Sequence, residues 1–187
     1  MNNIPIILAS ASPRRAELLG RIIKDFKVVP SGFDESRLDS TDPVMFAEKA
    51  SYEKAKDVAA LNFDTLVIGA DTIVVLGGEI FGKPQDLVHA KKMLLKLSGK
   101  THEVITALTL FRQGMSLTEH AVTEVTFKTL SEKDIDHYLR DNKVLDKAGS
   151  YAIQEIGDMF IKSIKGDHDN VVGLPVKLLR EMLRSFQ

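Results

Sequence analysis

The chain contains no cysteine among its 187 residues. It therefore has no disulfide framework, no thiol nucleophile and no cysteine-ligated zinc. It also lacks a long apolar run, since no stretch approaches the roughly 20 apolar residues of a membrane-spanning helix. The segment 1–9 has neither the basic start nor the apolar length of a secretory signal. We therefore predict a soluble, cytoplasmic protein.

A strong net charge is absent as well, because 25 Lys and Arg residues face 26 Asp and Glu residues and leave a charge of -1. Proteins that bind nucleic acids or membranes through charge usually carry an excess of basic residues. We therefore expect no nucleic-acid polymer and no membrane among the partners, and a bound anion must be met by a local cluster. A chain of this length can bury an ordinary core, and we predict a single domain over residues 1–187.

The hydrophobic pattern alternates between strand and helix periodicities. The predicted strands are 4–9, 26–29, 66–75, 102–111, 117–127, residue 153 and 159–164, with turns at 77–78 and 113–114. The predicted helices are 13–23, 43–60, 87–98, 131–140 and 175–186, and the first four begin at Ser12, Asp42, Asp86 and Ser131. Early strands alternate with helices and later strands are neighbours, so we predict an α/β fold with a mixed sheet.

Asp71 is the most unusual residue, because its carboxylate lies inside the apolar run 66–75. A run this rich in Val and Ile predicts a strand that is buried on both faces. An ionised carboxylate there is costly unless a metal ion, a cationic side chain or several hydrogen-bond donors compensate it. An aspartate that caps a turn at the strand end explains a lone residue equally well. The functional interpretation therefore depends on whether other polar residues also occur at unusual positions.

A second anomaly is the segment Ser10-Ala11-Ser12-Pro13-Arg14-Arg15. The first turn of a helix favours acidic residues, yet this predicted helix opens with two arginines. A strand-to-helix turn with serine hydroxyls, backbone N–H groups and arginines suits a bound phosphate. A solvated arginine pair on a surface helix remains the simpler explanation of the dipeptide alone. The segment lacks the glycines and the lysine of a P-loop.

Four further residues have both a functional and an ordinary interpretation. Lys83 lies in a Gly-Lys-Pro loop that could present its ammonium group, but a plain turn explains this loop about as well. Glu35 could join Asp71 around a hard cation such as Mg²⁺, but adjacent acidic residues in a loop usually serve only solubility. Lys54 lies among other lysines on a helix, where a solvated face is the default. The Gln154 amide suits the edge of a pyrimidine ring or a strand end. Two carboxylates, several cations and a helix N-terminus together would suit a polyphosphate.

Six ordered motifs resemble those of the Maf family, and the resemblance covers essentially the whole chain. The motifs lie at residues 10–15, 69–72, 82–84, 98–102, 146–154 and 172–175. Maf proteins are nucleoside triphosphate pyrophosphatases. The resemblance implies an ITPase-like α/β fold with an elongated mixed β-sheet flanked by helices and a cleft between two lobes. It also implies dependence on a divalent metal cation, Mg²⁺ or Mn²⁺, and frequently a homodimer.

The resemblance also implies roles for individual residues. Asp71 matches the family's proton acceptor. The positions that handle phosphate and metal are matched by Ser10, Arg14, Arg15, Glu35, Lys54 and Lys83, with Glu35 and Asp71 expected to hold the metal. The resemblance thus selects Lys54, which the local sequence leaves undecided.

Arg14, Thr72 and Gln154 resemble the branch that hydrolyses dTTP and UTP, and they are expected to determine base specificity. The branch for 7-methyl-GTP resembles Ser-Pro-Tyr-Arg at the first motif and lacks the Asp-Thr pair. One departure is Glu155, where the pyrimidine branch commonly has Gly, and which adds bulk and charge near the expected base pocket.

The expected reaction converts the triphosphate to the monophosphate and pyrophosphate, as nucleotide-pool house-cleaning. One alternative is a pyrophosphatase for 7-methyl-GTP or other modified nucleotides. Another is a nucleotide-sensing regulator of septum formation that binds without turnover. The paired carboxylates favour an enzyme, because a sensor needs only the cationic residues.

Overall fold

The computed structural model describes residues 4–186, and within them seven strands form one mixed sheet. The strands are β1 (Ile6–Leu8), β2 (Lys27–Val28), β3 (Leu66–Leu76), β4 (Glu79–Phe81), β5 (Thr101–Arg112), β6 (Met115–Phe127) and β7 (Ile161–Lys165). Their order is β2-β1-β3-β5-β6-β7, and β4 pairs with β3. β1 is parallel to β2 and β3, whereas the other pairs are antiparallel, which confirms the predicted mixed sheet.

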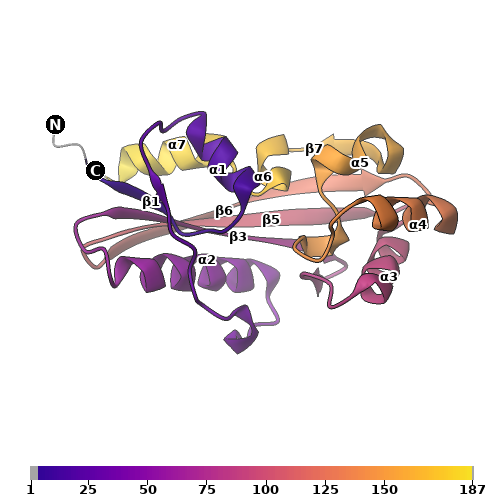
Figure 1. Cartoon of the computed structure of the whole chain (residues 1–187), viewed down its shortest axis with the longest axis horizontal. Coiled ribbons are helices and arrows are strands. Elements are labelled where there is room, and N and C mark those ends of the chain that lie inside the picture. Colours follow the sequence, from indigo (N-terminus) through magenta and orange to yellow (C-terminus); the bar gives the residue numbers. More distant parts are fainter. Residues whose placement is uncertain (1–3, 187) are drawn as a thin grey trace.

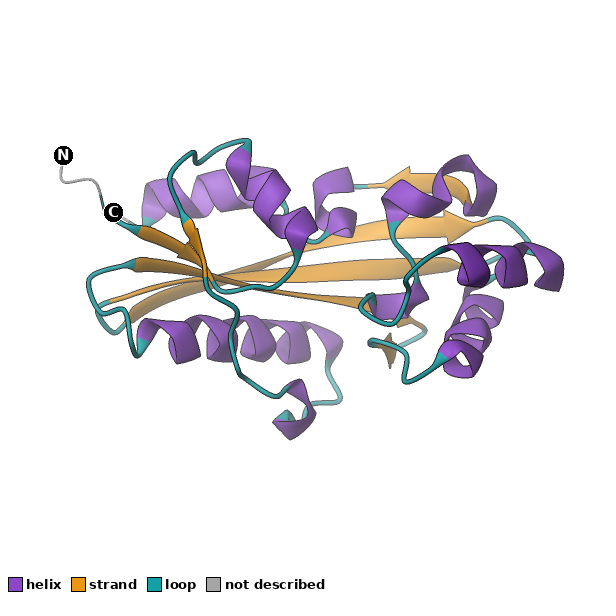
Figure 2. Cartoon of the chain, in the orientation of Figure 1, coloured by secondary structure: helices purple, strands orange, loops and turns teal. Residues whose placement is uncertain are grey.

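Helices flank this sheet along its length (Figure 2). They are α1 (Pro13–Gly20), α2 (Pro43–Ala59), α3 (Leu87–Leu97), α4 (Glu132–Asp141), α5 (Ile153–Phe160), α6 (His168–Val172) and α7 (Val176–Ser185), with short 3₁₀ helices η1 (Glu35–Arg37) and η2 (Ala148–Ser150). Figure 1 shows an elongated molecule in which α1, α7 and α2 lie around one half of the sheet and α3, α4 and α5 lie at the other. No helix within residues 4–186 combines the length and the apolar character needed to cross a bilayer.

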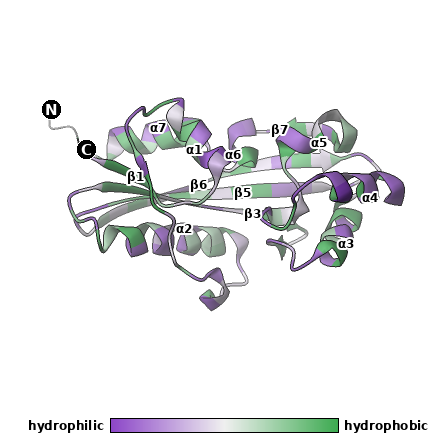
Figure 3. Ribbon diagram, in the orientation of Figure 1, coloured by the Kyte–Doolittle hydropathy of each residue, from purple (hydrophilic) through white to green (hydrophobic). Residues whose placement is uncertain are grey.

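The predicted helix starts are confirmed by side-chain caps. Ser12, Asp42 and Asp86 each accept a hydrogen bond from the backbone N–H three residues later. Ser131 and Asp134 form the predicted capping box at the start of α4. Along α2 and α7, hydrophobic and hydrophilic segments alternate, as expected of helices with one buried face (Figure 3).

Two of the four hydrophobic clusters within residues 4–186 lie toward opposite ends of the sheet, and the other two pack α2 against its strands. One core packs α3, α4 and α5 around aromatic rings, with Phe160 lying 6.0 Å from Phe127 and 5.2 Å from Tyr138 between ring centroids. The other core packs α1 and α7 against β1, β3 and β5, with Leu18 and Leu179 fully buried. These two cores define the two lobes that were expected.

Helix α2 lies unusually close to the central strand β3. A Cβ atom at Gly69 would lie 2.3 Å from the carbonyl oxygen of Ser51 and 2.8 Å from the Cβ of Ala55. Only glycine is compatible with this approach. The close packing brings Lys54 of α2 within reach of side chains on β3.

The strand prediction around Ile153 is wrong, because residues 153–160 form α5 and β7 begins only at Ile161. Helix α5 has no side-chain N-cap, and Gly157 interrupts it with φ 36° and ψ -136°. The local sequence therefore carries few helix signals. Contacts from other elements hold the first turn instead, including a hydrogen bond of 3.3 Å from Ala152 N to the Tyr138 hydroxyl.

Candidate active site

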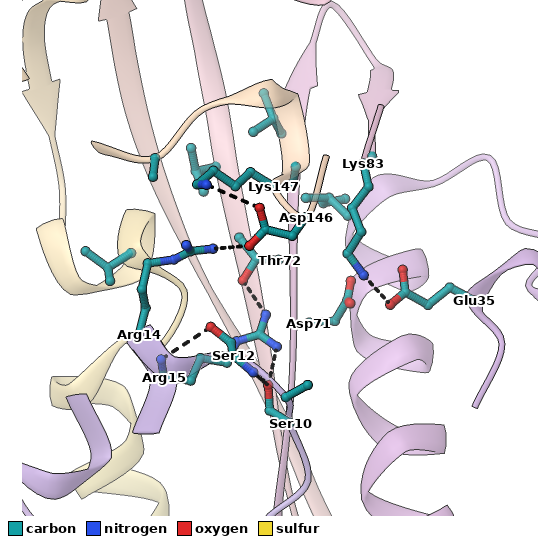
Figure 4. Close-up of a pocket in the computed structure, with 18 of the residues that line it drawn as sticks. Ser10, Ser12, Arg14, Arg15, Glu35, Asp71, Thr72, Lys83, Asp146 and Lys147 are labelled. Carbon is teal, nitrogen blue, oxygen red and sulfur yellow. Dashed lines mark hydrogen bonds and ion pairs between the residues drawn. The ribbon is translucent and has the colours of Figure 1, made fainter. Parts of the chain in front are cut away.

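A cavity of about 430 Å³ lies between the two lobes. It is bordered by the β1–α1 turn, α2, the middle of β3, the loop after β4, η2 and the start of α5. All of the predicted site residues line it: Ser10, Arg14, Arg15, Glu35, Lys54, Asp71, Thr72, Lys83 and Gln154. Figure 4 shows how those labelled converge from distant segments of the chain. The structure brings these residues together, and their individual roles stay predictions.

Asp71 lies in the middle of β3 and is only 4% exposed, in a strand that is buried on both faces as predicted. Its Oδ1 atom accepts a hydrogen bond of 2.6 Å from the Lys54 ammonium. The same ammonium donates to Oε1 of Glu35, also at 2.6 Å. Lys54 therefore supplies the cationic partner that a buried carboxylate requires.

The second carboxylate, Glu35, is held close to two lysines. Lys83 Nζ lies 3.5 Å from the Oε1 atom that Lys54 also contacts. Partial burial opposes ionisation of Glu35, but the two neighbouring ammonium groups prevail and lower its pKa below the ordinary value. The loop that leads to Glu35 is anchored on α2, where Asp57 Oδ2 accepts hydrogen bonds of 2.8 Å from Ser31 Oγ and from Gly32 N.

The Oδ2 atom of Asp71 is buried and has no hydrogen-bond partner among the described residues. An orphaned carboxylate oxygen beside a second carboxylate fits a hard divalent cation, which prefers oxygen ligands. Across residues 4–186, no three His, Asp or Glu side chains gather as a metal site by themselves. Phosphate oxygens of a substrate and water would therefore have to complete the coordination of a cation held by Glu35 and Asp71.

Arg15 is largely engaged by the protein itself. Its Nε donates to the carbonyl oxygen of Gly173 at 2.8 Å. One terminal nitrogen donates to Ser10 Oγ at 3.1 Å and to the Ala70 carbonyl at 3.0 Å, and the other donates to Thr72 Oγ1 at 2.9 Å. Burial lowers the pKa of Arg15, against the opposing charge of nearby carboxylates. Arg15 therefore ties α1 to β3 and to the segment before α7, with four of its five N–H groups in use.

Arg14 points toward the opposite wall of the cavity (Figure 4). Its nearest carboxylate is Asp146, at 3.8 Å, and Asp146 also accepts a hydrogen bond of 3.2 Å from Lys147. Lys147 is almost fully buried and has two further acceptors, Glu155 at 3.2 Å and the Lys143 carbonyl oxygen. Arg14 is thus only loosely held, whereas the three N–H donors of the Lys147 ammonium are occupied.

Asp146 and Lys147 are site residues to which the sequence gave no role. Their only sequence signal is their place in a motif with Gln154, because the contacts that define them come from other elements. Gln154 itself is exposed on the first turn of α5 and lines the cavity. Glu155, expected to add charge near the base pocket, is absent from the described lining, and its carboxylate accepts a hydrogen bond of 3.1 Å from Tyr138.

Tyr151 is another lining residue that the sequence did not single out. Its hydroxyl lies 2.7 Å from Nε2 of His102, and its ring packs edge-on against Phe127. Burial lowers the pKa of His102 to about 4, so this histidine is neutral at neutral pH. The hydrogen bond and the ring contacts hold Tyr151 against the core of the lobe that contains α5.

Thr72 belongs to a buried chain of hydroxyl groups behind the cavity. Its Oγ1 atom accepts from Arg15 and lies 3.0 Å from Oγ1 of Thr106. Thr106 in turn donates to the carbonyl oxygen of Asn170 at 2.9 Å. This chain connects α1, β3 and β5 through side chains and ends on the backbone of α6.

Cationic side chains from several elements and two carboxylates line one cavity. This combination suits a protein that binds a polyphosphate together with a divalent cation. The fold is similar to that of the Staphylococcus aureus Ham1 protein, with a TM-score of 0.56 and 16% identity over 98% of this chain and 100% of that chain. A HAM1 protein from Coxiella burnetii gives 0.52 and 16%, over 97% and 99%. The expected ITPase-like α/β fold is thereby confirmed.

The sequence comparison identifies the family. The Maf-like protein family matches residues 5–186, so the chain belongs to the Maf family. It is 42% identical to a dTTP/UTP pyrophosphatase of Clostridioides difficile, over 97% of this chain and 94% of that protein. Proteins of the same name from Akkermansia muciniphila and Escherichia coli are 48% and 43% identical, over 97% of this chain in both cases and 96% and 92% of those proteins.

Proposed function

We propose that this chain is a nucleoside triphosphate pyrophosphatase that hydrolyses dTTP and UTP between the α and β phosphates. The products are the nucleoside monophosphate and pyrophosphate. One observation carries the proposal: the buried carboxylate of Asp71, with one oxygen unpartnered, lies on the same cavity as the loosely paired cations Arg14 and Lys83. The relatives named dTTP/UTP pyrophosphatase support the reaction and the substrate class.

Arg14 and Lys83 are suited to bind the phosphates. Each has a single carboxylate partner, at 3.8 Å and 3.5 Å respectively, and each can exchange it for a phosphate oxygen. They extend from opposite sides of the cavity (Figure 4), so a polyphosphate between them would be held from both ends. Positive charge fixed in this way stabilises the negative charge that develops on the phosphate oxygens during cleavage.

Asp71 is suited to accept the proton of the attacking water. Its Oδ1 atom is occupied by Lys54, which keeps the carboxylate in one orientation, while the lone pairs of Oδ2 are free. As the water oxygen bonds to phosphorus, the α–β phosphoanhydride bond breaks, pyrophosphate leaves, and the water proton passes to Asp71. The Lys54 ammonium offsets the negative charges of both Asp71 and Glu35.

Glu35 and Asp71 would hold the divalent cation, Mg²⁺ or Mn²⁺. When bound, such a cation neutralises phosphate charge and polarises the bond that is cleaved. Ser10 lies in the turn between β1 and α1, where its hydroxyl accepts hydrogen bonds from Ser12 N at 3.2 Å and from Arg15 at 3.1 Å. Ser10 thereby stabilises the β1–α1 turn, which lines the cavity and would contribute to phosphate binding.

We place this activity in the cytoplasm, as removal of unwanted nucleotides from the free pool. A net charge of -1 and a cavity rather than an open basic surface support free nucleotides, not nucleic-acid polymers, as substrates.

A homodimer is part of the proposal and is tested by sedimentation velocity at several protein concentrations.

The proposal is tested by kcat/KM for a panel of triphosphates with Mg²⁺ or Mn²⁺, using pyrophosphate release as the signal. We expect dTTP and UTP to be the best substrates. A higher kcat/KM for 7-methyl-GTP would overturn the assignment to pyrimidines. If dTTP binds but survives prolonged incubation with either cation, the protein is a sensor and not an enzyme.

A further inference from the structure

The direction of each hydrogen bond in the buried hydroxyl chain can be deduced. A hydroxyl group has one proton, and that of Thr106 is donated to the Asn170 carbonyl, which can only accept. The bond between Thr106 and Thr72, 3.0 Å long, must therefore use the proton of Thr72. Arg15 donates to the same Thr72 oxygen at 2.9 Å. Thr72 is left with one lone pair and no free proton, so toward a ligand it can accept but not donate.

The directions of these hydrogen bonds are maintained by Thr106 and Asn170, which are buried and make further hydrogen bonds. Thr106 and Asn170 are both fully buried. The Asn170 carbonyl also accepts from Gly173 N at 3.0 Å. The Asn170 side chain donates to the Val104 carbonyl at 2.9 Å and to Thr123 Oγ1 at 3.0 Å. Reversing the chain would leave a buried carbonyl without one of its two donors, which is unfavourable.

The acceptor role of Thr72 affects which nucleotide base can bind, because Thr72 lines the cavity together with Gln154. Uracil and thymine carry an N3–H donor on their Watson–Crick edge, whereas N3 of cytosine is an acceptor. A side-chain amide has both a donor and an acceptor and can rotate to match either base. Gln154 alone therefore cannot separate them, but an oxygen that only accepts can.

We infer that Thr106 is a positioning residue that fixes Thr72 as a hydrogen-bond acceptor, so that the site selects uracil and thymine over cytosine. The inference rests on the proposed function, with Thr72 beside the base. Neither contact of Thr106 involves the substrate, and its effect passes entirely through the proton of Thr72.

The test compares kcat/KM for UTP and CTP in the wild type and in Thr106→Val. Without the Thr106 oxygen, the Thr72 proton is free to turn toward N3 of cytosine, so we expect the UTP-to-CTP ratio to fall about tenfold. Thr106→Ser keeps the hydroxyl and should keep the ratio. Thr109→Val is the matched control, because Thr109 is equally buried on the same strand and bonds to Ser51 and Thr118, at 2.9 Å each.

A double substitution distinguishes positioning from general loosening of the fold. Once Thr72→Val has removed the oxygen, adding Thr106→Val should leave the UTP-to-CTP ratio unchanged. A wild-type ratio in Thr106→Val would overturn the inference, as would a wild-type enzyme that treats UTP and CTP alike. If no triphosphate is cleaved, the proposed function fails instead. In that case the dissociation constants for UTP and CTP are compared instead. Equal constants for the two nucleotides would overturn the inference.

Discussion

Lys54→Met tests the electrostatics of the site most sharply, because it removes the ammonium that both carboxylates share. Glu35 and Asp71 each lose a partner at 2.6 Å, and two negative charges are left side by side. Breaking a buried ion pair by removing one member costs about 3–5 kcal/mol. The Glu35 side chain is 33% exposed, so water screens part of this effect. We therefore expect a loss of about 3 kcal/mol in the free energy of unfolding.

For a protein of this size, each kcal/mol lowers Tm by about 2–4 °C, so Lys54→Met should melt about 6–12 °C below the wild type. Thermal unfolding is followed by circular dichroism at neutral pH with a chelator present, so that no metal replaces the lost ammonium. Lys56→Met is the control on the same helix. Lys56 is 52% exposed and lies 3.4 Å from Glu53, a surface pair whose loss should cost less than about 0.5 kcal/mol.

Adding Mg²⁺ or Mn²⁺ should raise the Tm of Lys54→Met more than that of the wild type, because the variant has two carboxylates without a cation. A Lys54→Met variant that melts within about 2 °C of the wild type would show that the two carboxylates do not depend on the Lys54 ammonium. So would equal shifts for Lys54→Met and Lys56→Met.

Three further predictions concern neighbouring residues. Asp71→Asn should lower kcat by about 10²–10⁴-fold. The protein should stay folded, because Lys54 keeps its contact with Glu35. A near-normal kcat in steady-state assays would exclude Asp71 as the base. The pKa of Glu35 is lowered on folding, so its ionisation adds stability above its ordinary value of 4.5 that is lost as pH falls through the folded pKa. Glu35→Gln should flatten this acid-side loss in denaturant unfolding, and a slope parallel to the wild type would contradict the assignment. Arg15→Lys should lower the free energy of unfolding by about 3 kcal/mol, because several hydrogen bonds are lost. Arg14→Lys should leave Tm unchanged and raise KM. Similar Tm values for the two variants would contradict this difference.

Features encoded within a few residues could be predicted from the sequence. The caps at Ser12, Asp42, Asp86 and Ser131 each use a bond that spans three residues, so local letters suffice. The buried strand around Asp71 could likewise be predicted, because runs of apolar residues flank Asp71 on both sides. In both cases the physical cause lies inside the segment that carries the signal.

Features created by contacts between distant segments could not be predicted. Lys54 stands among lysines on α2, and only the close approach at Gly69 brings it to Asp71. The sequence offers no reason why Arg15 should be engaged by the protein while Arg14 is only loosely held. The first turn of α5 lacks local helix signals and depends on Tyr138 from another helix.

The proposed reaction is cleavage between the α and β phosphates of a pyrimidine nucleoside triphosphate. The most direct measurement incubates the protein with dTTP and Mg²⁺ and identifies the products by phosphorus NMR and chromatography, with Asp71→Asn run in parallel. We expect dTMP and pyrophosphate in equal amounts from the wild type and almost none from the variant. Release of dTDP and inorganic phosphate would instead show cleavage between the β and γ phosphates and exclude the proposed reaction.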